Sequence, residues 1–267
     1  MLRLLMKYEF KAVRRIMLPL YGAWMVISVV FGLAIKLFIN DSGLPVIILG
    51  MIYSVVTVTV IILTIILVIQ RFYKNLLGNE GYLMFTLPVS IGKHVWNKTI
   101  SASIWVVFGT ILGLISAGII AVCNGGLSHM LQAINQMITE ITEQIGTGIT
   151  AILVIEVIVL ALLMCGEAAL KIYAAISVGH QWSNHRVLGA IGAYLGFAIV
   201  EVIISNIISK VNDAMGIAEK LLDWSRTMNI TAQTQLGILF LALLTCIFIA
   251  IYYVITYKLL EKKLNLQ

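Results

Sequence analysis

Charged side chains are scarce in this chain of 267 residues, since 11% of its residues are Asp, Glu, Lys or Arg and 61% are hydrophobic. A soluble domain carries about 25% charged residues. The shortage excludes an ordinary soluble domain and predicts an integral membrane protein. The formal net charge of +6 does not indicate a nucleic-acid partner, because Lys and Arg also mark the cytoplasmic ends of membrane helices.

Cysteine is also rare, and the three cysteines lie in or beside apolar runs at Cys123, Cys165 and Cys246. Their odd number argues against a disulfide framework, and without a Cys-x-x-Cys pair they are predicted to be small packing residues. The four histidines are scattered along the chain, at His94, His129, His180 and His185. We therefore expect no metal site.

The sequence also lacks the motifs of an enzyme. No segment reads GxxxxGK[ST], and Gly92-Lys93-His94 lacks both the earlier glycine and the following hydroxyl. There is no HExxH motif, no Ser/His/Asp set and no pair of soluble carboxylates. We expect the chain to bind no cofactor and to catalyse no reaction itself. No cleavable signal is expected, because the first apolar run follows a long charged segment and lacks a small-x-small site.

Long apolar runs are what the sequence has instead. A membrane-spanning helix needs about 20 apolar residues, and six runs are long enough. They lie near Met17–Phe38, Pro45–Ile69, Thr99–Cys123, Ile149–Ile176, Val187–Ser209 and Gln235–Tyr257. The predicted fold is an all-α integral membrane protein with a six-transmembrane-helix bundle, formed as one domain over residues 1–267.

The basic residues predict the orientation of these spans. If the N-terminus is cytoplasmic, 14 of the 18 Lys and Arg residues fall on the inner side. The four on the outer side are Lys36, Lys210, Lys220 and Arg226. Because Lys and Arg concentrate in cytoplasmic segments, both termini are expected on the cytoplasmic side of a plasma membrane.

The N-terminal segment 1–16 has the pattern of an amphipathic helix. Its apolar residues Leu4, Leu5, Tyr8, Ala12 and Ile16 fall near one helical face, and five basic residues cover much of the rest. The pattern favours a helix in the inner membrane interface, held by apolar burial and anionic lipids. The alternative is a solvated basic segment that only sets the topology.

Two segments on the predicted outer side also repeat apolar residues at helical spacing. The first repeats them from Leu127 to Ile145 and the second from Ile217 to Met228. Each stripe could lie on the outer lipid surface, cap the bundle or pack against a second copy.

Ionisable residues inside the apolar runs are functional candidates, because buried charge is costly in a membrane. Glu167 and Lys171 stand at positions i and i+4, which predicts a structural pair near the inner end of the fourth span. Lys171 could also extend to the cytoplasm. Glu156 and Glu201 are expected at a shared depth in the outer half, roughly 10–12 Å below the surface and without a cation on either span.

Two readings of Glu156 and Glu201 remain open. They could line a polar path that attracts a cationic substrate such as a peptide. Alternatively they are protonated or hydrogen-bonded to neighbours, for example Ser205 and Asn206, and hold helices together.

The most informative polar stretch lies between the second and third spans, at residues 70–98. It reads QRFYKNLLGNEGYLMFTLPVSIGKHVWNK, with four basic residues and the single acid Glu80. Lipid cannot satisfy these polar groups, so the stretch must lie in water or at an interface. Its interior is apolar at Leu83, Phe85 and Leu87, and Pro88 interrupts any helix before it.

This stretch resembles the loop between spans two and three of the permease subunits of type-2 ATP-binding-cassette (ABC) exporters. The family pattern is an acid, a Gly, an apolar stretch, a Pro and a small polar residue, then a Lys that opens the third span. It is matched in order by Glu80, Gly81, Leu83, Leu87, Pro88, Val89, Ser90 and Lys98. The segments KYEFKA and RFYKNLLGNEGYLMFTLPVS are similar to permease-like membrane proteins of Gram-positive bacteria.

The resemblance implies that the loop forms a cytoplasmic coupling helix, which docks in a groove of a separate ATPase subunit that binds ATP and Mg. Leu83, Phe85 and Leu87 would supply its apolar face. Glu80 would stand at its N-terminus, where a negative charge suits the helix dipole, and Pro88 would end it. The alternative is an ordinary cytoplasmic loop with a proline turn.

We therefore expect the permease half of an ABC transporter, which works as a dimer with a second permease copy or homologue and two ATPase subunits. It would export an antimicrobial peptide, a lipid-like compound or a drug. Two other classes fit the residues: a membrane binding or immunity protein that transports nothing, and a proton-coupled carrier that uses Glu156 and Glu201.

Overall fold

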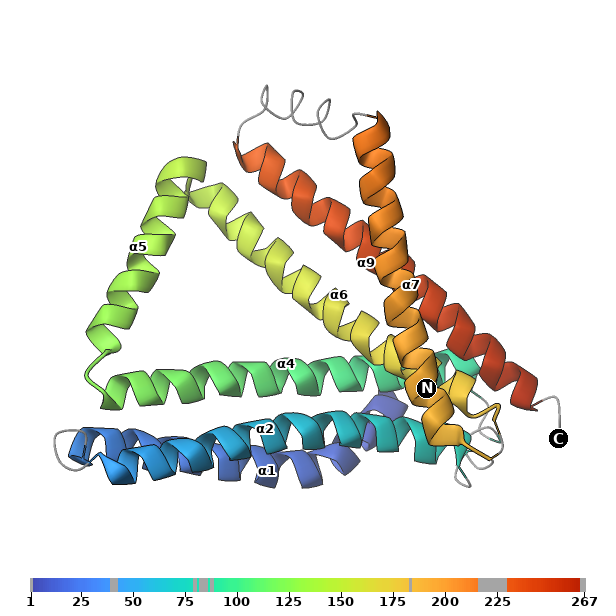
Figure 1. Cartoon of the computed structure of the whole chain (residues 1–267), viewed down its shortest axis with the longest axis horizontal. Helices are drawn as coiled ribbons and strands as arrows, with labels where there is room; N and C mark the ends of the chain where they lie inside the picture. The colour runs from blue at the N-terminus through green and yellow to red at the C-terminus, as the bar shows by residue number, and fades with distance from the viewer. Residues whose placement is uncertain are drawn as a thin grey trace. The chain divides into compact units, whose positions relative to one another are not determined.

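The computed structural model describes residues 2–38, 43–78, 81, 86, 89–182, 184–215 and 230–264. This part of the chain is helical and contains no strand. The elements, in order, are α1 (Leu2–Phe38), α2 (Leu44–Phe72), the π-helical segment η1 (Tyr73–Leu77), α4 (Ile91–Cys123), α5 (Leu127–Ile145), α6 (Thr147–Gly179), α7 (Arg186–Met215) and α9 (Ile230–Leu264) (Figure 1).

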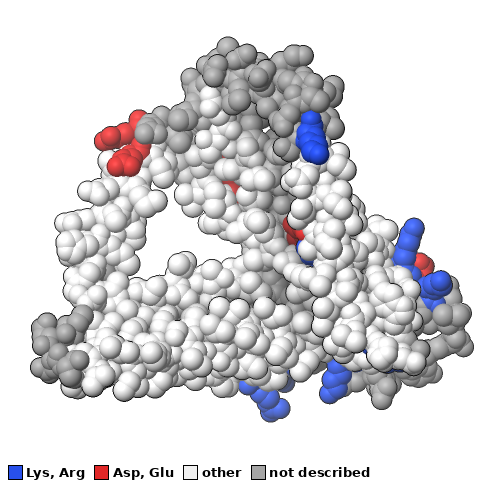
Figure 2. Space-filling view, in the orientation of Figure 1, with Lys and Arg blue, Asp and Glu red and all other residues white. Residues whose placement is uncertain are grey.

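Six of these helices are long and apolar enough to cross a membrane, as the sequence predicts. They cover Arg3–Phe38, Leu44–Leu77, Ile91–Cys123, Thr147–Gly179, Arg186–Ile208 and Thr231–Lys262. Each includes nearly all of one predicted run, and the architecture is that of a multi-pass membrane protein. Long stretches of helix surface carry no charged side chain (Figure 2). Such a surface suits lipid, because side chains of helices that span a bilayer face hydrocarbon.

The helices form two compact units. The first comprises Met1–Arg71 and Ile100–Thr142, and the second comprises Phe72–Thr99 and Glu143–Gln267. One membrane domain over residues 1–267 stays a prediction.

The first unit has an aromatic core between α1, α2 and α4. Its buried members are Val13, Met17, Tyr21, Trp24, Val60 and Trp105. The hydroxyl of Tyr21 donates to the Trp105 carbonyl oxygen at 3.2 Å, and the Trp24 indole donates to Thr57 Oγ1 at 2.9 Å. Tyr21 and Trp24 can therefore be buried here, because each of these two polar tips has a partner.

Small residues of α4 make this core possible. A Cβ atom on Gly109 would stand 2.8 Å from the Tyr21 hydroxyl, and one on Gly113 would stand 3.2 Å from the Trp24 ring. Ser116, fully buried, lies 2.7 Å from Ser28 Oγ and 2.8 Å from the Tyr53 hydroxyl. One serine thus joins α1, α2 and α4.

The predicted N-terminal interfacial helix is not a separate element. Residues 2–16 are helical, but they form the first turns of α1 and continue into the first span. Their five basic side chains are exposed, as are Leu4, Tyr8 and Ile16 at 57%, 66% and 47%. Phe10 and Val13 instead pack on the core. Contact of the exposed face with lipid stays a prediction.

The second predicted amphipathic segment beyond the spans, from Ile217 to Met228, lies outside the described residues. The first is α5, a helix of 19 residues. Its apolar stripe is exposed at Leu131, Ile134, Ile138 and Ile141.

In the second unit, α6 packs against both α7 and α9, the yellow, orange and red helices of Figure 1. The turn from α6 to α7 is very close. A Cβ atom on Gly179 would stand 2.2 Å from the Ala190 backbone nitrogen. Only glycine fits at this position without moving the backbone of α7.

Candidate functional site

The structure describes both flanks of the predicted coupling segment, residues 70–78 and 89–98. Of its seven predicted coupling residues, five lie outside the described part of the chain: Glu80, Leu83, Phe85, Leu87 and Pro88. A coupling helix and the docking role of these residues therefore stay predictions. Gly81 and Lys98 are described, and both are buried.

Gly81 stands in a tight backbone turn. Its N–H donates to the Gly78 carbonyl oxygen at 2.9 Å. A Cβ atom there would stand 2.8 Å from the carbonyl oxygen of Leu76, which is a backbone atom and cannot swing aside. The glycine of the motif is thus required by close approach of the chain to itself.

Lys98 does not open the third span at its first turn, because α4 begins at Ile91. Its side chain is only 5% exposed. A direct contact between this ammonium and a partner subunit is not available in this conformation. Lys98 belongs instead to a group of buried polar residues at this end of the unit. The others are Asn75, His94, Asn97 and Thr99.

Both flanks of the segment are held by the same side chain, Tyr173 of α6. The Phe72 ring, at the end of α2, stacks on the Tyr173 ring with 4.1 Å between centroids and 8° between planes. The Tyr173 hydroxyl donates to the carbonyl oxygen of Lys98 at 3.3 Å. Phe72 and Tyr173 are 0% and 1% exposed, so water does not compete for these contacts. Tyr173 therefore connects the two ends of the 72–98 segment to α6.

Two further ring contacts strengthen this attachment. Tyr73 of η1 meets His180 just beyond α6 edge-on at 5.8 Å, and Trp96 of α4 packs on Tyr253 of α9 at 5.5 Å. Aromatic pairs at such separations add about 0.5–1.5 kcal/mol beyond area burial. The flanks of the segment are thus fixed to both α6 and α9.

The second feature of the unit is a charge triad of Lys171, Glu201 and Tyr252, contributed by α6, α7 and α9. Lys171 Nζ donates to Glu201 Oε2 in a salt bridge, and the Tyr252 hydroxyl donates to Glu201 Oε1. The Lys171 ammonium also lies 5.1 Å from the centroid of the Tyr194 ring, a cation–π contact. The triad joins three helices at one carboxylate.

The triad corrects two sequence-based expectations. Lys171 forms its ion pair with Glu201 and not with Glu167. Glu201 therefore has a cation on the neighbouring span, where none was expected. The physical reason is the packing of α6 on α7, which brings the lysine side chain to a carboxylate 30 residues away.

The arrangement satisfies both charges within an apolar region. The side chains of Lys171 and Glu201 are 12% and 24% exposed. An isolated charge at such a place is costly, whereas a hydrogen-bonded pair offsets much of that cost. Both oxygens of Glu201 accept a hydrogen bond, and a role of this carboxylate in a substrate path stays a prediction.

Glu156 lies far from this triad. It precedes Lys171 by 15 residues on α6, about 22 Å along the helix axis. The expectation that Glu156 and Glu201 share a depth is therefore wrong, since Glu201 lies at the level of Lys171. The expected depths assume that the outer ends of the two apolar runs are level, whereas α6 and α7 are aligned by their contact at Gly179. One carboxylate oxygen of Glu156 is buried without a hydrogen-bond partner among the described residues.

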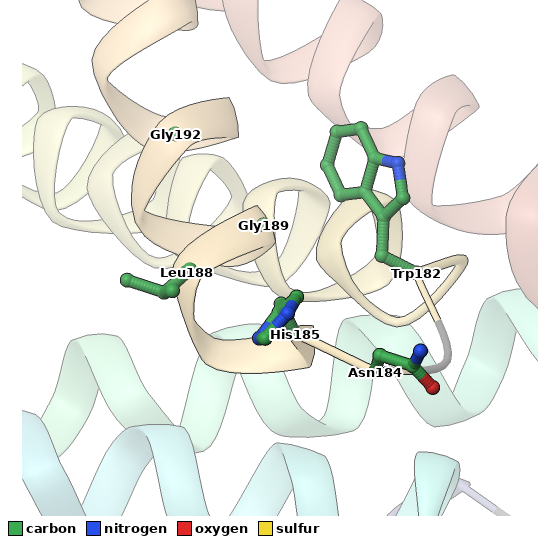
Figure 3. Close-up of a pocket in the computed structure, with 6 residues that line it drawn as sticks. All are labelled: Trp182, Asn184, His185, Leu188, Gly189 and Gly192. Atoms are coloured by element: carbon green, nitrogen blue, oxygen red, sulfur yellow. The ribbon is translucent and has the colours of Figure 1, made fainter.

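An open pocket of about 460 Å³ lies at the turn from α6 to α7. Its lining residues are Trp182, Asn184, His185, Leu188, Gly189 and Gly192. Figure 3 shows the Trp182 ring standing apart from His185 and Leu188, so these side chains do not converge on one point. Within the described ranges, no group of three or more His, Cys, Asp or Glu residues could hold a metal ion.

Sequence reasoning singled out Lys171 and Glu201 but missed Phe72, Tyr173 and Tyr252. A tyrosine within an apolar run gives a weak indication of a polar contact, because its hydroxyl needs a hydrogen-bond partner when it is buried. Nothing in the sequence says which partner that is. Comparison of the chain with protein-family models, with curated proteins and with solved structures finds no match.

Proposed function

We propose that this chain is the membrane permease subunit of an ABC exporter, in which ATP is hydrolysed by a separate subunit bound at residues 70–98. The resemblance of that loop to permeases of type-2 exporters motivates the proposal. The observation that carries it is the attachment of both loop flanks to Tyr173. A loop that must transmit force to membrane helices needs such a rigid connection, because a slack tether would absorb the displacement.

In this scheme, closure of the ATPase subunits displaces the coupling helix, and the flanks carry the displacement to α6 and α9. The docking surface and its turn consist of Glu80, Gly81, Leu83, Phe85, Leu87 and Pro88. Lys98 acts from inside the unit, where Tyr173 binds its carbonyl oxygen. The substrate class is a peptide, a lipid-like compound or a drug, exported across a bacterial plasma membrane by two permease copies or homologues.

The test is purification of the tagged protein from its native membrane in mild detergent, with identification of co-purifying chains and measurement of ATP hydrolysis. We expect a stoichiometric ATPase subunit, which Glu80→Ala and Pro88→Ala lose. Tyr8→Ala serves as the control, because Tyr8 is exposed and distant in sequence from the loop. Purification of the chain without any ATPase, in every detergent tried, would refute the proposal.

One observation favours a second function, a proton-coupled carrier. It is the buried carboxylate oxygen of Glu156, which has no hydrogen-bond partner among the described residues. In proteoliposomes that contain only this chain, a carrier would release or take up protons in response to substrate, and Glu156→Gln would abolish this flux. An ABC permease would show no flux without its ATPase.

A further inference from the structure

Two carboxylates stand within reach of Lys171, on two different helices. Glu201 of α7 holds it in the structure, and Glu167 lies one turn away on α6 itself. In the order Glu then Lys at i and i+4, the Cβ atoms are about 5–6 Å apart and pairing is favourable. Glu167 makes no ion pair of its own within the described part of the chain.

A lysine ammonium in an apolar region must keep a counter-charge, but it need not always keep the same one. Its side chain is a flexible four-carbon stem with a compact charge, which suits it to exchange between two acceptors. Moving from Glu201 to Glu167 would leave Lys171 paired. It would also remove the salt bridge that joins α6 to α7, while Tyr252 could remain bonded to Glu201.

We propose that Lys171 is a two-position switch, which fastens α7 to α6 through Glu201 in the present state and releases α7 when it pairs with Glu167. Lys171 contacts Glu201 and Tyr194 of α7, Tyr252 of α9 bonds the same Glu201 carboxylate, and Glu167 lies one turn away on the helix of Lys171 itself. Lys171 lies two residues from Tyr173, the anchor of the 72–98 segment, on the same helix. The switch is a property of this chain alone and does not rest on the proposed transport function.

The test compares thermal unfolding of the purified protein in detergent for four variants. Glu167→Gln should leave Tm near that of the unchanged protein, because Glu167 is unused in the present state. Glu201→Gln should lower Tm modestly, because Lys171 retreats to Glu167. The double variant should lower Tm on the order of 10 °C, far beyond the sum of the two, because a buried ammonium is left unpaired.

The triple variant, which adds Lys171→Met to both changes, removes the unpaired ammonium and should recover most of the loss. If the double variant does not fold, folding of the triple variant supports the switch in the same way. Equal Tm values for Glu201→Gln and the double variant would overturn the proposal. A large loss from Glu167→Gln alone would also overturn it, as would failure of the triple variant to recover.

Discussion

At the scale of single residues, helix packing in the second unit depends on a glycine at a close backbone contact and on one carboxylate that binds two other helices. Gly179 lets α7 fold back on α6, and Glu201 collects hydrogen bonds from two other helices. Both act through geometry that a larger or neutral side chain cannot reproduce. Each therefore gives a sharp substitution test.

The first test concerns Gly179. Gly179→Ala should destabilise the protein by about 1–3 kcal/mol, because the added methyl would collide with backbone atoms of α7. Gly192→Ala is the matched control: no atom lies within 4 Å of its Cβ position, and alanine is the better helix former. Thermal unfolding in detergent should show a lower Tm for the first and an unchanged or higher Tm for the second. Equal Tm values would contradict the close turn.

The second test concerns Tyr252. Tyr252→Phe should cost about 1.5–3 kcal/mol, because it removes a hydrogen bond to a charged group and leaves a carboxylate oxygen without a donor. Tyr194→Phe is the control, since it keeps the ring that faces Lys171. The measurement is again Tm in detergent, supported by the exchange rate of backbone amides in α9. A Tm for Tyr252→Phe no lower than that of the control would show that Glu201 does not depend on this hydroxyl.

At the scale of elements, helix existence could be read from the sequence, and helix pairing could not. The six spans and α5 follow from local apolar patterns, which the bilayer length and the helical period make specific. The partner of each helix depends on side chains far apart in the chain. Ser116 is one example, because it joins α1 and α2 to α4 through two hydroxyl contacts.

Ser116→Ala should therefore loosen three helices at once, with a cost of about 1 kcal/mol for each hydrogen bond lost. Ser54→Ala is the control, because Ser54 is exposed and bonds only its own helix, at Met51. Tm measured in detergent should fall for Ser116→Ala and stay unchanged for Ser54→Ala. A Tm as high as that of the control would mean that the hydroxyl cluster adds no net stability.

At the scale of the whole molecule, the distribution of basic residues predicts the topology. We expect both chain ends on the cytoplasmic side and the segment from α4 to α5 outside. In a variant with Cys123, Cys165 and Cys246 replaced by alanine, a membrane-impermeant maleimide should label Ser128→Cys in intact cells. It should label Lys262→Cys only after the membrane is opened. Labelling of Lys262→Cys in intact cells would reverse the predicted orientation.

Much of the membrane architecture was determined by sequence alone, because membrane spans are local: about 20 apolar residues have few alternatives to a helix in lipid. The need to pair Lys171 was also evident, since a lone charge in an apolar run is costly. Which carboxylate it binds was decided only by tertiary structure. Glu167 and Glu201 are both suitable acceptors, and the packing of α7 on α6 selects the distant one. The role of Tyr173 was likewise decided by tertiary structure. A buried tyrosine can contact many partners, and only the fold brings both flanks of one loop to its ring and hydroxyl.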